Sequence, residues 1–304
     1  MAGRLGGPGP VAGRPPEASM NLPASPCLPS PPGCGITTFA FREVRLSMMA
    51  AARDEPPPAD GPSLPPRFLR HADEHTVVGL RAVLAAVADH PRPPVLTGHA
   101  VVSAPCQAGR MTAARTLAAL PTGGGATVSP HLVPQCSLHS TAGAVSVALG
   151  MHGPHLGVGG GPDALAEGLL AAATLLIGAG DPACPAAWLV ATEWDEEPRL
   201  DDAGAAENDP VCRALAMLLE PIGPPEDGGD ALPELSLAVQ MPRGPVIGPR
   251  LHEPAGGLVA FARALAMCRE GGALAWWTVS CPWGGAIRVA GHPRGRSRFR
   301  REAA

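Results

Sequence analysis

The stretch GPHLGVGGGPDALAEGLLAAATLL, residues 153–176, decides the fold class of this chain. Its residues HLGVG (155–159) predict a short buried strand, and the apolar spacing that follows predicts a helix over 163–178. The glycines between them predict a tight strand-to-helix turn. Pro162 suits the first helical turn, and Asp163 suits the positive end of the helix dipole. A strand, a glycine turn and a helix in succession are typical of α/β proteins.

Strands and helices are expected to alternate along the rest of the chain. Strands are expected over 36–46, 93–105, 186–194, 211–221 and 232–241, helices over 68–89, 109–120, 140–150 and 254–272, and a terminal hairpin over 274–291. The segment 126–137 is expected to be an extended connection. Alternation at this frequency predicts α/β layers around a mixed sheet.

Composition divides the chain into three parts. Residues 1–35 are rich in Pro, Gly and Ser and are expected to be disordered, residues 36–290 to form one domain, and residues 291–304 to form a basic tail. The net charge of −4 gives no global basic field for nucleic acid or for a membrane surface. The chain has no signal-peptide core and no run of 18 apolar residues, so we expect a cytoplasmic protein.

Residue types and spacings that the sequence lacks exclude several kinds of catalytic and metal site. All 23 basic residues are arginine, and the chain has neither Lys nor Tyr, which excludes Schiff-base catalysis, a phosphate-binding P-loop lysine and Lys or Tyr general bases. The eight cysteines are scattered without any C-x-x-C pair, so no zinc knuckle or redox motif is indicated. We therefore expect neither a metal nor a cofactor.

The glycine run does not fit a dinucleotide site. Gly157-Val158-Gly159-Gly160-Gly161-Pro162 begins like G-x-G-x-x-G, but Pro162 stands where the third glycine is required. The run also follows a late strand instead of the first one. A tight turn is the better interpretation.

Cys136 and His139 are the weak candidates for a nucleophile and its base. A reactive cysteine needs a depressed pKa and an oxyanion hole, and spacing alone indicates neither, so structural roles are favoured. Ser137 is expected to cap the helix that follows. His71 and His75 lie four residues apart without a third ligand and are expected on a solvated helix face.

Acidic side chains cluster after the strand expected at 186–194. Glu193, Asp195, Glu196 and Glu197 are expected to form a surface loop and not a pair of catalytic carboxylates.

One continuous segment carries a family resemblance. VSPHLVPQCSLHSTAGAVSVALGMHGPHLGV, residues 128–158, resembles the corresponding run of β-ketoacyl synthases, especially their small ketosynthase-like and chain-length-factor relatives. LPPRFLRHADEHTVVGLRAVLAAVAD resembles the first long helix of that family, CRALAMLLEP a strand ending in Leu-Glu-Pro, and PAGGLVAFARALAMCREG and SCPWGGAIRVA the last helix and hairpin. The resemblance implies a reduced thiolase-like α/β/α layered fold.

The same resemblance implies that the catalytic machinery is missing. In active ketosynthases an acyl-accepting cysteine begins the helix after the buried strand, and that position falls on Pro162 here. The family lysine has no counterpart in a chain without Lys. The segment that would carry the first family histidine is missing between Glu220 and Leu251. The second family histidine has only a possible counterpart in His252, whose spacing to Gly257 is one residue short.

The resemblance therefore implies an inactive chain-length-factor-type protein that pairs with an active ketosynthase, or with itself, through residues 131–160. Fatty-acid, aryl-polyene or polyketide assembly is the implied pathway, with an acyl carrier protein as a further partner. Two alternatives stay open: an acyl-transfer enzyme that uses Cys136 and His139, and a non-catalytic module that binds a carrier protein.

Overall fold

The computed structural model describes residues 34–59, 62–90, 95–178, 184–221, 235–240, 257–270, 277–280 and 286–291. Residues 32–304 group as one compact unit. Residues 1–33 and the basic tail from 292 lie outside the described residues, so the expectations for them stay predictions. Cys34 and Gly35, which the composition assigned to the N-terminal segment, belong to the first strand.

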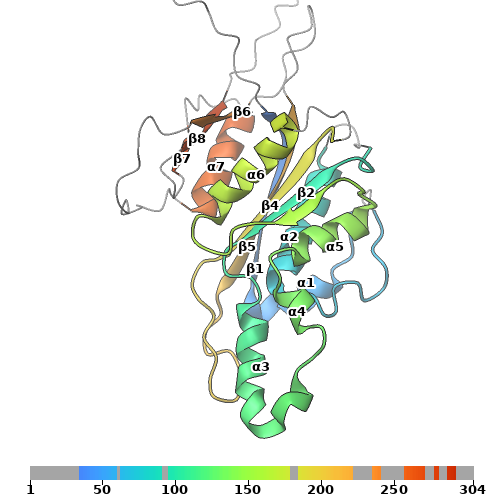
Figure 1. Ribbon diagram of the computed structural model, residues 1–304, viewed down its shortest axis with the longest axis vertical. Coiled ribbons are helices and arrows are strands. Elements are labelled where there is room, and N and C mark those ends of the chain that lie inside the picture. Colours follow the sequence, from blue (N-terminus) through green and yellow to red (C-terminus); the bar gives the residue numbers. More distant parts are fainter. Residues whose placement is uncertain are drawn as a thin grey trace, which may run out of the picture. The chain divides into compact units, whose positions relative to one another are not determined.

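The described strands form one mixed sheet in the order β3-β2-β4-β5-β1-β6-β8-β7 (Figure 1). Their bounds are β1 Cys34–Arg45, β2 Ala100–Pro105, β3 His155–Gly157, β4 Ala187–Trp194, β5 Val211–Pro221, β6 Leu235–Gln240, β7 Trp277–Ser280 and β8 Ala286–Gly291. β2 pairs in parallel with β3 and with β4, and every other pairing in the sheet is antiparallel. The mixed sheet that the sequence predicted is confirmed.

Helices cover both faces of the sheet. Their bounds are α1 Met49–Asp54, α2 Glu74–Ala88, α3 Arg110–Gly123, α4 Leu132–Cys136, α5 Ser140–Leu149, α6 Ala164–Gly178 and α7 Leu258–Arg269, with 3₁₀ turns η1 Leu46–Met48 and η2 Gly124–Thr127. One apolar cluster joins α6 and α7 to one face of the sheet, and a second joins α1, α2 and α5 to the other. The layered α/β/α fold class is therefore confirmed.

The central strand β4 shows how the sequence builds these two layers. Successive side chains of a strand point to opposite faces of the sheet. Leu189 accordingly packs in the cluster with α6 and α7, whereas Trp188 and Val190 pack in the cluster with α2 and α5. All three side chains are fully buried. A strand covered on both faces reads as a continuous apolar run, as AAWLVATEW does.

Two expectations about the first half of the chain are wrong. The segment 126–137 is not extended, because the end of η2 and the whole of α4 lie within it. The helix expected over 68–89 begins only at Glu74, since Asp73 is its N-cap and accepts a hydrogen bond from the Thr76 N–H at 2.8 Å. An N-cap aspartate satisfies an N–H group that the first turn leaves without a partner.

The strand after α5 also differs from its expectation. β3 spans His155–Gly157 only, and its residues are exposed or half-buried. It forms an edge of the sheet, where β2 is its partner strand. An edge strand leaves backbone N–H and C=O groups open for pairing with another chain.

β1 is paired unevenly along its two edges. β5 pairs with it from Cys34 to Arg45, whereas β6 pairs only with Cys34 and Gly35. Beyond Gly35, the second edge of β1 has no strand beside it among the described residues. The two parts of the sheet separate at this point.

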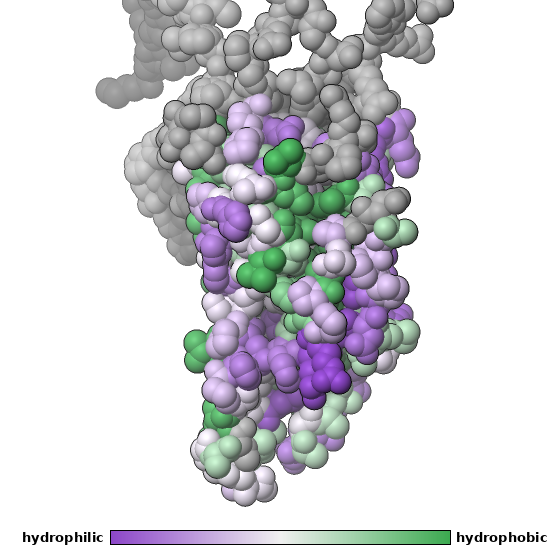
Figure 2. Space-filling model, turned by 90° about the vertical axis from the view of Figure 1, so that its right-hand side faces the viewer, coloured by the Kyte–Doolittle hydropathy of each residue, from purple (hydrophilic) through white to green (hydrophobic). Residues whose placement is uncertain are grey.

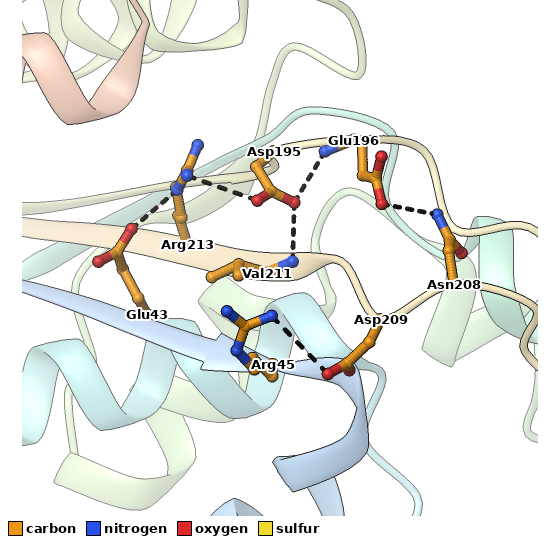
Figure 3. A network of polar contacts seen from close by, with 8 residues as sticks. All are labelled: Glu43, Arg45, Asp195, Glu196, Asn208, Asp209, Val211 and Arg213. Carbon is orange, nitrogen blue, oxygen red and sulfur yellow. Dashed lines mark hydrogen bonds and ion pairs between the residues drawn. The ribbon is translucent and has the colours of Figure 1, made fainter.

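The acidic connection after β4 is held against β5 (Figure 3). Asp195 accepts the Val211 N–H at 2.7 Å and lies 3.6 Å from the Arg213 guanidinium, which also donates to Glu43 at 2.9 Å. Asp195 and the two glutamates after it are exposed, as expected, but Glu193 lies on β4 and is half-buried. Exposed ion pairs of this kind contribute little stability, so the network mainly fixes the path of the connection.

Candidate functional site

The bend between β3 and α6 is the place where the family resemblance puts a nucleophile. Gly159 and Gly160 have φ angles of +87° and +100°, a region that side chains with a Cβ rarely adopt. Pro162 and Asp163 form the turn before α6, which begins at Ala164, one residue later than expected. The Pro162 side chain is exposed and offers no nucleophile, and a proline has no N–H to hold an oxyanion.

The bend packs against the start of α5. A Cβ on Gly157 would lie 2.2 Å from the Leu138 carbonyl carbon and 2.4 Å from the His139 nitrogen, so only glycine permits this approach. Ser103 of β2 donates to the Leu138 carbonyl oxygen from the same side. The structure therefore brings the strand before the bend and the backbone of His139 together.

Cys106 and Glu193 lie beside this bend, and the sequence analysis did not single out this pair. Cys106 follows β2 directly and forms an isolated parallel bridge with Gly160. Burial and the Glu193 carboxylate raise the pKa of the Cys106 thiol. Burial likewise raises the pKa of Glu193, although the Leu258 N–H at the start of α7 donates to it at 3.5 Å and opposes this shift.

A signal for this pair was present in the sequence. Both residues stand at the carboxyl ends of expected strands, and sites in α/β proteins gather where the carboxyl ends of parallel strands meet. The parallel pairing of β2 with β4, which places the two ends together, is visible only in the structure. A thiol with a raised pKa is protonated at neutral pH and is a poor nucleophile.

Cys136 is held as a structural thiol. It ends α4, is half-buried, and its Sγ donates to the Gly109 carbonyl oxygen at 3.4 Å. Burial raises the pKa of this thiol, and the carboxylates of Asp73 and Glu74 raise it further. These shifts are opposite to the one that activates a nucleophilic cysteine.

His139 does not serve Cys136 as a base among the described contacts. Its ring stacks on the ring of His155 with the centroids 4.9 Å apart, and burial and His155 both lower its pKa. His139 occupies the N-cap position of α5, so the expectation that Ser137 caps this helix is wrong. The Ser137 hydroxyl instead accepts the His139 N–H at 3.2 Å.

An open pocket of about 390 Å³ lies between α2, α4 and α5. Its polar lining includes His71, Asp73, His131 and His139. His71 and His131 stack with their ring centroids 5.7 Å apart and an interplanar angle of 8°. Asp73 is 3% exposed, and its Oδ2 has no hydrogen-bond partner among the described residues. Burial raises the pKa of this carboxyl group.

His75 is buried, so the expectation of a solvated helix face is wrong for it. Its Nδ1 shares a hydrogen bond with the Thr192 hydroxyl at 2.8 Å, and burial lowers its pKa to about 4. Among the described residues no group of three or more His, Cys, Asp or Glu side chains could hold a metal ion. His252 lies outside the described residues. No helix in the described part of the chain is long and apolar enough to cross a membrane.

Comparison with known proteins finds similarity at the level of structure. No family model matches the sequence, and no curated protein matches it. Solved structures similar to this chain include a β-ketoacyl synthase from Burkholderia phymatum, at 14% identity and a TM-score of 0.43, covering 62% of this chain and 59% of that one. An oxazolomycin ketosynthase domain from Streptomyces albus aligns at 17% identity and a TM-score of 0.38, covering 80% of this chain and 62% of the domain.

A third match is an HMG synthase of the curacin biosynthetic pathway in complex with a holo donor acyl carrier protein. It aligns at 14% identity and a TM-score of 0.36, over 78% of this chain and 52% of that one. The chain spans about three fifths of the length of the first two structures. The matched proteins include members of the family that residues 128–158 resemble. At these TM-scores the function has to be argued from the residues of this chain.

Proposed function

We propose that this chain is a catalytically silent β-ketoacyl synthase-like protein that acts as the partner subunit of an active ketosynthase, in the manner of a chain-length factor. The observation that carries the proposal is Pro162 in the turn before α6, where the resemblance places the acyl-accepting cysteine. The helix that would activate a thiolate there is present, but the thiol is not.

The neighbouring thiols support a silent site. Cys106 and Cys136 are the two half-buried cysteines of the described residues, and the pKa of each is raised. The chain also has no lysine to complete the family machinery. Residues of a catalytic set act as a unit, so restoring one of them recovers little activity.

A partner role is supported by the surface around α5 and β3. Val147 on α5 is 72% exposed and Val133 on α4 is 78% exposed. Figure 2 looks at the side on which α5 lies in Figure 1 and shows apolar side chains gathered among polar ones. The free edge of β3 adds backbone groups that a partner strand can pair with. Exposed apolar side chains that gather on one face are a feature of interaction sites.

The test is association with an active ketosynthase. The full chain is co-expressed with a ketosynthase, and the purified proteins are examined by size-exclusion chromatography with light scattering. Complex formation is expected for wild type and is expected to be lost in Val147→Asp and Ala144→Asp, because each places a carboxylate at the contact. Met267→Asp is the matched control, since Met267 is 57% exposed on α7 at the other face of the sheet.

Two outcomes contradict the proposal. If wild type stays a well-folded monomer alone and with the ketosynthase, the partner role is wrong. If the isolated chain forms a stable acyl thioester at Cys136 with a reactive acyl analogue, or if Pro162→Cys alone gains condensing activity, the silent site is wrong.

A further inference from the structure

A second cleft, of about 630 Å³, lies beside β1 beyond Gly35, where no described strand pairs with the second edge of β1. Residues of β1, of the carboxyl-terminal end of α2 and of α7 line it, together with Arg213 of β5. Phe39, Phe41 and Ala262 belong to its apolar lining. The cleft is separate from residues 131–160 and therefore from the partner surface proposed above.

Four arginines converge on this cleft in a chain whose net charge is −4. Arg213 is engaged by Glu43 and Asp195, as Figure 3 shows. The remaining three, Arg42, Arg263 and Arg269, form no ion pair with a carboxylate of the described residues. Asp89 at the end of α2 is the second carboxylate of the lining. Among the described residues that line the cleft, four guanidinium groups therefore face two carboxylates, so positive charge is in excess there.

A structural role accounts for only one of these three guanidinium groups. Arg269 lies in the last turn of α7, where the helix dipole favours a cation, and it stacks over Phe39 at 4.6 Å from the ring centroid. Arg263 lies near the middle of α7, away from the helix end. Arg42 is an exposed residue of β1. Among the described residues, Arg42 and Arg263 thus have no ion-pair partner that accounts for their position.

We propose that this cleft binds a small organic anion, one that carries a phosphate or a carboxylate group on an apolar body. Guanidinium groups recognise both head groups through paired, charge-assisted hydrogen bonds. The half-buried side chains of Phe41 and Ala266 in the lining contact the apolar body. A volume of about 630 Å³ is within the range of small-molecule sites and is too small for a folded partner.

The test is isothermal titration calorimetry on the full chain with three probes of one shape. 1-Naphthyl phosphate and 1-naphthoate carry the two head groups, and 1-naphthol is the neutral control. Both anions are expected to bind with a Kd below about 1 mM, and 1-naphthol at least about tenfold more weakly. The tighter of the two anions identifies the preferred head group.

The variants locate the site. Arg42→Ala/Arg263→Ala is expected to weaken the binding of both anions at least about tenfold. Arg70→Ala is the matched control, because Arg70 is exposed outside the cleft and should leave binding unchanged. Circular dichroism checks the fold, and Arg263→Gln, a single change on an exposed position of α7, replaces the double variant if that variant unfolds. The proposal is overturned if neither anion binds, if 1-naphthol binds as tightly, or if the cleft variants bind like wild type.

Discussion

Helices α2 and α3 have nearly the same length and the same numbers of alanines and leucines, but α2 adds four valines, and the two helices differ completely in burial. Thirteen of the fifteen residues of α2 are buried, whereas Met111 is the one buried residue of the fourteen in α3. α2 lies across β1, β4 and β5, while α3 extends beyond the end of the sheet (Figure 1). Leu117 of α3 is 67% exposed.

The difference teaches that alanine and leucine content does not by itself place a helix in the core. Hydrophobic stabilisation follows the apolar area removed from water, and that area depends on what lies opposite the helix. α2 has a sheet face opposite it. In the described part of the chain α3 contacts mainly η2 and α4. Four measurements can break or sharpen this contrast.

The largest difference is expected in hydrogen exchange. Amides of α2 should exchange only through global unfolding, and amides of α3 through local opening, because α3 has few buried apolar contacts to lose. With an ordinary domain stability this predicts at least about a 1,000-fold difference in protection at neutral pH. Exchange monitored by mass spectrometry on the full chain measures it. Equal protection of the two helices would remove the contrast.

Truncating one leucine in each helix tests the same contrast energetically. Leu84 of α2 is fully buried, so Leu84→Ala should lower the free energy of unfolding by about 2–5 kcal/mol. Leu117→Ala should change it by no more than about 0.5 kcal/mol, because that side chain is already in water. Urea unfolding followed by circular dichroism compares the two variants. A large loss from Leu117→Ala would place α3 in the core.

The buried histidine of α2 should make stability depend on pH. Burial lowers the pKa of His75 from 6.5 to about 4 in the folded state, so the unfolded state binds more protons between these values. Stability is therefore highest above pH 6.5 and is lost as the pH falls toward 4, by about 3 kcal/mol in total.

Urea unfolding at pH 7, 5.5 and 4 gives the free energy of unfolding of wild type and of His75→Gln. The change of their difference with pH is the contribution of His75. The variant is less stable at pH 7, since it changes the hydrogen bond to Thr192, but it should lack this part of the pH dependence. Parallel pH profiles of the two proteins would show that His75 titrates alike in both states. His71→Gln is the control, because its ring lies at the pocket surface.

The smallest effect is expected at the bend before α6. Of two adjacent glycines there, one has a backbone conformation that strains other residues and one does not. Gly160 has a φ of +100°, so Gly160→Ala should cost about 1–2 kcal/mol of unfolding free energy. A Cβ on Gly161 meets no atom within 4 Å, and its φ is not in the left-handed region. Gly161→Ala should therefore be neutral or stabilise by up to about 1 kcal/mol. Thermal unfolding of both variants measures the difference, and equal losses would contradict the geometry of the bend.

Much of the fold could be predicted from local sequence. The strands at 186–194 and 211–221 and the helices after Asp163 and Gly257 lie where apolar spacing and glycine turns placed them. Segments with few apolar contacts were predicted worst. The connection 126–137 holds the end of η2 and the whole of α4, and the strand expected over 155–159 is a short edge strand with exposed or half-buried residues. Neither segment has a strong periodicity of apolar residues, so its conformation depends on the helices and strands that it connects.

The sequence by itself determined the α/β layers, the absence of lysine chemistry and the proline in the turn before α6. These follow from residue identity and from periods of two and of 3.6 residues, which are local properties of a chain. Only the tertiary structure decided that the Glu193 carboxylate raises the pKa of the Cys106 thiol, that His75 is buried and that arginines from β1, β5 and α7 share one cleft. Such proximities join residues far apart in the sequence, and they arise from the order of the strands and the placement of the helices. No local sequence pattern therefore predicts them.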